Sequence, residues 1–191
     1  MTVPAWIEVQ LAVGGALKLA RGDRRGLGFF DTSIDGFWRS FRAGVICYPL
    51  YLFLVSFRVA SAQWEVSGVA PILIVETIAY VISWVAFPLF VLPVARHLGR
   101  ADRFLSFMVV YNWSQIPQTV LFVLVGLDTA TGLLPPSSAH FAGLLAAIAA
   151  LVYEWYIARV ALAVTGTQAT LVIIIDLLLS TTVGRIAQSL Y

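Results

Sequence analysis

Residues 138–161 read SAHFAGLLAAIAALVYEWYIARVA, and an uncharged run that begins at Thr129 continues through them to Tyr153. The run is longer than the about 20 apolar residues that carry a helix across the hydrocarbon core of a bilayer, so it predicts a membrane-spanning helix. At helical spacing one face collects small residues: Ala139, Gly143, Ala147 and Ala150. The same face continues into Glu154. Because small side chains let a neighbouring helix approach closely, we expect Glu154 to point into a helix bundle.

The composition extends this prediction to the whole chain. Of its 191 residues 60% are hydrophobic and 12% are charged, whereas about a quarter of the residues in soluble domains are charged. Apolar runs predict five spans, at about residues 43–62, 69–93, 104–126, 138–161 and 169–187. The expected fold is therefore all-α: a polytopic membrane helix bundle in which residues 37–191 form the transmembrane domain.

Residues 1–36 are expected to form a cytoplasmic segment. Its apolar part, residues 4–20, is too short to span and predicts a helix along the membrane surface, with Trp6 as an interfacial anchor. We expect the chain to keep its N-terminus, because no basic region precedes this stretch. Further on, Asp31, Thr32 or Ser33 can cap the next helix.

Basic residues in the same segment favour contact with anionic lipid headgroups: Lys18, Arg21, Arg24 and Arg25. A basic cluster directly before a membrane helix sets orientation, so nucleic acid is not an expected partner. Of the 12 Lys and Arg residues, all but Arg58 and Arg185 fall on the cytoplasmic side if the N-terminus is inside. The positive-inside rule therefore predicts a cytoplasmic N-terminus and an outside C-terminus, in a bacterial inner membrane.

Polar residues inside the predicted spans are the candidate functional residues. Arg58 and Glu76 lie at similar depths in the first two spans, so we expect them to pair, with Tyr80 and Ser83 completing the cluster. This group either fixes the register of two helices or belongs to an ion or proton path.

A second polar layer is predicted closer to the cytoplasmic side. Asn112, Glu154 and Asp176 lie at matching depths, with Gln115 on the polar face of the third span. Two carboxylates at one depth cannot both be charged comfortably, so either Arg159 reaches them or one holds a proton. The layer is either a network that joins three helices or a proton or cation site. A four-span alternative, in which Asp176 breaks the last helix, is less favoured, because an acid facing the bundle is tolerated.

No catalytic pattern is present. The sequence holds no HExxH, no nucleotide-binding glycine motif and no CxxC, and Cys47 is its single cysteine. His97 and His140 fall on opposite sides of the predicted membrane and cannot share a metal. We therefore expect no enzyme, cofactor or metal site.

The last hairpin, WYIARVALAVTGTQATLVIIIDLLL at residues 155–179, joins an aromatic-bearing helix to a helix that opens with small residues through a short glycine turn. In this hairpin and in its overall layout the chain resembles the Yip (Ypt-interacting protein) family in its bacterial branch, over residues 35–190. The resemblance implies an interaction or membrane-organising role.

Two functions are therefore expected. The first is association, as an accessory or assembly subunit of a membrane complex or as a homo-oligomer. The alternative is a small proton- or cation-coupled carrier or channel that uses Glu154, Asp176 and Asn112.

Overall fold

The computed structural model describes residues 5–132 and 135–191, and every element in this part of the chain is a helix. In chain order the elements are α1 (Ala5–Ala20), η1 (Arg24–Phe29), α2 (Ile34–Ser40), α3 (Arg42–Arg58), α4 (Ser61–Ser67), α5 (Val69–His97), η2 (Ala101–Arg103), α6 (Phe104–Thr131), α7 (Pro136–Ala161) and α8 (Gly166–Gln188). Pro4, the first residue of the predicted interfacial helix, lies outside the described residues.

The five predicted spans are confirmed as helices long and apolar enough to cross a bilayer. They are Ile34–Arg58, in which α2 and α3 are combined, and then α5, α6, α7 and α8. Asp176 lies inside α8 without interrupting it, so the fifth helix is present. The first span begins earlier than predicted, because the Ser33 hydroxyl caps α2 by accepting a hydrogen bond from the Gly36 amide at 3.0 Å. It also ends sooner, at Arg58, because the backbone of Val59 is extended.

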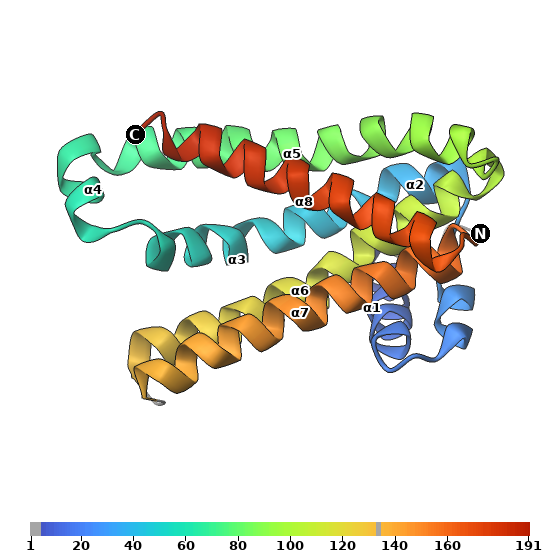
Figure 1. Cartoon of the computed structure of the whole chain (residues 1–191), viewed down its shortest axis with the longest axis horizontal. Coiled ribbons are helices and arrows are strands. Elements are labelled where there is room, and N and C mark those ends of the chain that lie inside the picture. The colour runs from blue at the N-terminus through green and yellow to red at the C-terminus, as the bar shows by residue number, and fades with distance from the viewer. Residues whose placement is uncertain (1–4, 133–134) are drawn as a thin grey trace.

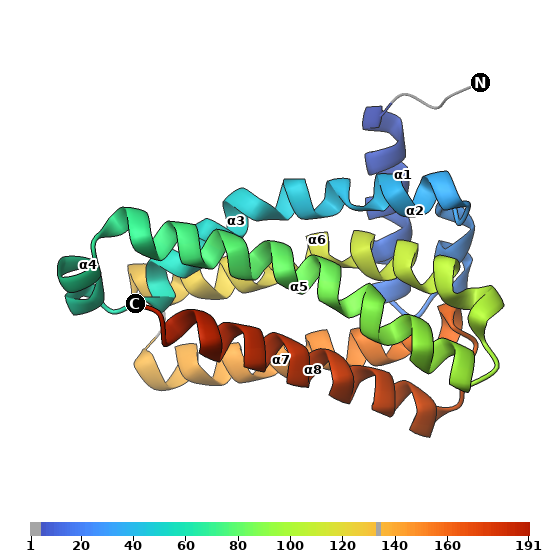
Figure 2. The same cartoon turned by 90° about the horizontal axis from the view of Figure 1, so that it is seen from above.

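The five long helices form a ring. Helix α3 contacts α5 and α6, α6 contacts α7, α7 contacts α8, and α8 returns to α5. All five run along the long axis of the molecule (Figures 1 and 2). We call the end that carries α1 and the start of α2 the α1 end, and the end that carries α4 and Tyr191 the α4 end. All basic residues except Arg58 and Arg185 lie in segments at the α1 end.

Helix α1 crosses the long axis of the bundle at the α1 end, as both views show (Figures 1 and 2). It packs against η1, α6 and α7. Gly15 and Gly26 allow the backbones of α1 and η1 to touch, since a Cβ on Gly26 would lie 2.5 Å from the Gly15 carbonyl oxygen. The hydroxyl of Tyr153 also donates a hydrogen bond to the Ala16 carbonyl at 2.7 Å.

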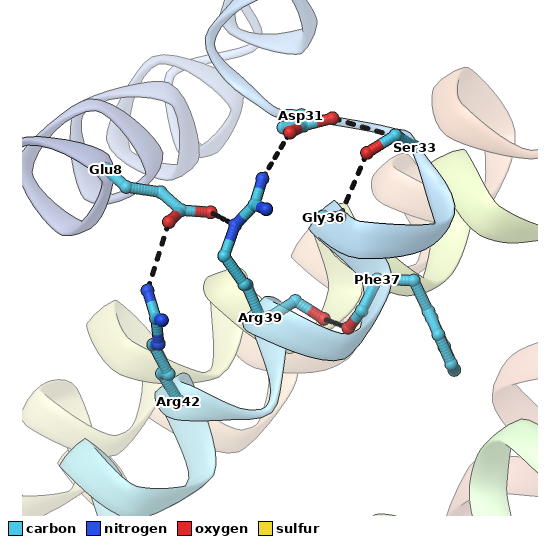
Figure 3. Close-up of polar contacts among 8 residues, drawn as sticks. Glu8, Asp31, Ser33, Gly36, Phe37, Arg39 and Arg42 are labelled. Atoms are coloured by element: carbon cyan, nitrogen blue, oxygen red, sulfur yellow. Dashed lines mark hydrogen bonds and ion pairs between the residues drawn. The ribbon is translucent and has the colours of Figure 1, made fainter. Parts of the chain in front are cut away.

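An ion-pair cluster holds α1 against α2 (Figure 3). Glu8 accepts hydrogen bonds from Arg39 at 2.9 Å and from Arg42 at 3.2 Å. Arg39 also pairs with Asp31, which precedes α2. The cluster joins residues about thirty positions apart and so fixes how α1 is rotated about its own axis.

A short helix connects α3 to α5. Residues Ser61–Ser67 form this helix, α4. Only Gly68, with φ +79°, adopts a conformation that ends a helix, and the residues before it are all compatible with one. The Trp64 indole donates to the Val59 carbonyl at 3.2 Å and ties α4 to the end of α3.

Candidate functional site

A cleft of about 520 Å³ lies inside the ring, and all five long helices line it. At the α4 end it is bordered by Arg58 of α3 and Gly184 of α8, and at its other limit by Glu154 of α7 and Asp176 of α8. Its other polar lining residues are Tyr51, Tyr80, Ser83, Tyr111, Asn112, Gln115, Gln118, Thr119 and Ser180. Beyond the two acids the α1 end is a packed apolar core that includes fully buried Phe107 and Met108.

Glu154 and Asp176 form a carboxyl pair across the interface of α7 and α8. Both side chains line the cleft, and each is close enough to influence the other electrostatically. The Tyr111 hydroxyl donates to Asp176 Oδ2 at 2.9 Å, and the Gln115 amide lies 3.5 Å from Glu154 Oε1. None of the ion pairs among the described residues includes either acid. Two neighbouring carboxylates without a counter-charge favour the uptake of a proton or a cation.

Arg159 does not reach this pair, which removes one of the two predicted ways of neutralising it. Its guanidinium lies 5.4 Å from the ring centroid of Trp155, one turn earlier on α7. Arg159 follows Glu154 by five residues, which is about 140° around a helix, so the two side chains leave α7 on different sides.

Asn112 lines the cleft, but its amide is used elsewhere. It donates to the Ser40 hydroxyl at 2.8 Å, because α2 packs against this side of α6. Asn112 thus lines the same cleft as Glu154 and Asp176, while the hydrogen bonds to the two acids come from Tyr111 and Gln115. Sequence reasoning missed Tyr111, although it precedes Gln115 by one helical turn and extends the same polar face.

The predicted ion pair between Arg58 and Glu76 is present. Arg58 donates to Glu76 Oε2 at 2.6 Å, and the Glu76 side chain is 1% exposed. Two further hydroxyls, from Tyr51 and Tyr191, donate to the same carboxylate at 2.5 Å each. The buried carboxylate is thus fully neutralised and hydrogen-bonded, in contrast to the acids of α7 and α8.

Tyr80 and Ser83, predicted to complete this cluster, do not. The Tyr80 hydroxyl donates to the Gly44 carbonyl at 2.7 Å, and the Ser83 hydroxyl donates to the Ala79 carbonyl within its own helix. The tyrosine ring points toward the α1 end and brings its hydroxyl to Gly44 near the start of α3, away from Arg58 at the end of that helix, and the serine is too short to leave α5.

Among residues 5–132 and 135–191 no three His, Cys, Asp or Glu side chains are placed to hold a metal ion together. The chain matches no family model, and neither a curated protein nor a solved structure was found to be similar to it.

Proposed function

We propose that this chain is a small integral membrane carrier or channel for protons or small cations, with Glu154 and Asp176 as its binding group. One observation carries the proposal: five apolar helices enclose a largely apolar cleft in which a few polar side chains lead to a carboxyl pair with no basic partner among the described residues. Intramembrane acids that face a cavity and lack a counter-charge are typical of ion and proton pathways.

The shape of the cleft favours a carrier over a permanently open pore. Near the acids the rings of Phe87 and Tyr111 lie 4.3 Å apart and join α5 to α6. The apolar core fills the space from there to the α1 end. In the proposed carrier, ions reach the acids from the α4 end, and release at the α1 end requires α5 and α6 to separate, as in alternating access.

The distribution of charge supports an orientation for this carrier. Ten of the 12 basic residues lie at the α1 end, which places that end in the cytoplasm by the positive-inside rule. In a bacterial inner membrane the cleft then opens to the outside, and protons or cations would reach Glu154 and Asp176 from there.

The association role that the sequence favours, and with it the Yip resemblance, stays a prediction. It depended on small-residue faces that a partner could contact. In α7 this face is already used within the chain, because Ala139, Ala150 and Ala158 are buried where α7 packs against α6 and α8. A partner would therefore have to bind elsewhere on the ring.

The test is ion flux into vesicles that contain the purified chain. With an imposed gradient of protons, Na⁺ or K⁺, the wild type should carry at least one of these ions above the level of empty vesicles. The double variant Glu154→Gln/Asp176→Asn should lose the flux. A control with the same change of charge, Glu65→Gln/Asp102→Asn, alters two exposed acids outside the cleft and should keep it.

A second variant tests the cleft without changing the acids. Gly184 lines the cleft, and a Cβ added there meets no atom within 4 Å, so Gly184→Leu can fill the α4 end without a clash. We expect this variant to elute as a folded protein and to lose most of the flux. Wild-type vesicles with no flux for any of the three ions, or full flux in both variants, would overturn the proposal.

A further inference from the structure

Helix α1 has two faces of different character. The buried face carries Ala12, Gly15, Ala16 and Leu19, which pack on η1 and the bundle. Away from this buried face the helix exposes four large apolar side chains: Trp6, Ile7, Leu11 and Leu17, of which Trp6 is 68% exposed. Trp6 and Leu17 lie about 160–180° around the helix from Gly15 and so point away from η1, whereas Leu11 lies about 40° from Gly15.

The position of α1 gives this exposed face a direction. In Figure 1, η1 lies against α1 on the side toward the α1 end of the bundle. The opposite face of α1 therefore looks back along the five long helices. With these helices across a bilayer, that direction leads from the headgroup level into the hydrocarbon, where an apolar face is stable.

Basic side chains lie at the C-terminal end of α1 and on the η1 side of this helix. Arg21, Arg24 and Arg25 are exposed, and the ammonium group of Lys18 lies 5.1 Å from the ring centroid of Phe29, itself an exposed apolar residue. None of the four takes part in an ion pair among the described residues. The apolar side chains are directed into the bilayer, and the cations lie at the level of the phosphates. This arrangement matches an anionic leaflet.

We infer that α1 and η1 form a docking surface for anionic phospholipid, in which the apolar face of α1 enters the leaflet and Lys18, Arg21, Arg24 and Arg25 bind its headgroups. The Glu8 ion pairs in Figure 3 orient the apolar face of α1 before any lipid binds, because they fix the rotation of α1 against α2. The inference rests on the proposed membrane insertion of the five helices, and it does not depend on transport.

Spin labels on the full chain test the depth of α1. Replacing Cys47, the single cysteine, by Ala allows one label to be placed at Trp6 or Leu17 on the apolar face. Gly28 is the control, since it is exposed on η1 and has open space around it. In vesicles of phosphatidylcholine and phosphatidylglycerol, we expect labels at Trp6 and Leu17 to be relaxed by oxygen and protected from an aqueous nickel chelate, and the label at Gly28 to show the reverse.

A charge-neutral variant tests the choice of lipid. Changing Lys18, Arg21, Arg24 and Arg25 to Gln should reduce several-fold the phosphatidylglycerol that stays bound in native mass spectrometry, relative to phosphatidylcholine. Changing Arg96, Arg100 and Arg103 to Gln, at the same end but in the connection between α5 and α6, should not. Aqueous accessibility at both Trp6 and Leu17 would overturn the docking surface and leave the face to a protein partner. Equal loss of phosphatidylglycerol in the two variants would overturn the role of the four named cations.

Discussion

The ion pair between Arg58 and Glu76 predicts an unequal response to its two single substitutions. Glu76 is 1% exposed, whereas the Arg58 side chain is 41% exposed. Arg58→Gln leaves a buried carboxyl without its cation. Glu76→Gln leaves an arginine that can turn toward water or headgroups. Loss of the arginine should therefore destabilise the fold more than loss of the acid.

The magnitudes follow from this geometry. In Arg58→Gln the carboxyl can escape its isolation by taking up a proton, which at pH 7 costs about 4 kcal/mol for an ordinary glutamic acid and sets an upper limit. The hydroxyls of Tyr51 and Tyr191 still donate to the Glu76 carboxyl at 2.5 Å. We therefore expect Arg58→Gln to lower the free energy of unfolding by about 3 kcal/mol. Glu76→Gln should lose about 1–2 kcal/mol, mainly through weaker hydrogen bonds. The double variant Arg58→Gln/Glu76→Gln should lose about 1–2 kcal/mol less than the sum of the losses in the two single variants.

The assay is equilibrium unfolding in mixed lipid and detergent micelles, followed by tryptophan fluorescence during titration with a denaturing detergent. Arg185→Gln is the matched control, because it removes an exposed arginine from the same end of the bundle and should change the free energy of unfolding by less than about 0.5 kcal/mol. The deficit of Arg58→Gln should shrink as the pH is lowered toward 5, because protonating the carboxyl then costs less. Equal losses in the two single variants, or strict additivity in the double variant, would refute the reasoning.

Two further predictions concern the α1 end. Gly26→Ala puts a Cβ 2.5 Å from the Gly15 carbonyl oxygen. It should lower the free energy of unfolding by about 2 kcal/mol and speed tryptic cleavage in η1. In the control Gly28→Ala the added Cβ meets nothing within 4 Å, so neither quantity should change. Hydrogen bonds from Ser33, aided by the Arg39 guanidinium, hold the pKa of Asp31 below its ordinary value of 3.8. Asp31 therefore stabilises the start of α2 above that pH and ceases to do so as the pH falls through the pKa that Asp31 has in the folded state. Asp31→Asn should remove this acid sensitivity from the hydrogen exchange of α2. An unchanged pH profile in the variant would contradict the prediction.

Part of the candidate site could be predicted from local properties of the chain. Length and apolarity decide whether a segment can cross a bilayer, so the five helices followed from composition along the sequence. Arg58 and Glu76 sit on successive helices joined by a short connection, which forces similar depths, and their pairing followed from that constraint. Glu154 faces the interior because it continues a stripe of small residues on one helix face.

The partners of these residues depended on which helices are neighbours. Tyr191 reaches Glu76 because α8 packs beside α5, and Asn112 bonds Ser40 because α2 covers one side of α6. Neither contact has a local signal, since the residues are far apart in the chain. Hydropathy cannot supply the neighbour relations either, because lipid and the interior of a helix bundle are equally apolar, and a helix is compatible with either on each of its faces.

The sequence by itself thus determined the number of long apolar helices, the concentration of cations at one end, and the acids that must avoid lipid. Only the tertiary structure decided the order of the ring, α3, α6, α7, α8 and α5, and with it the cleft that joins the two polar groups. The physical reason is that crossing a bilayer is a property of each segment alone, whereas the ring order results from the close packing of side chains between segments.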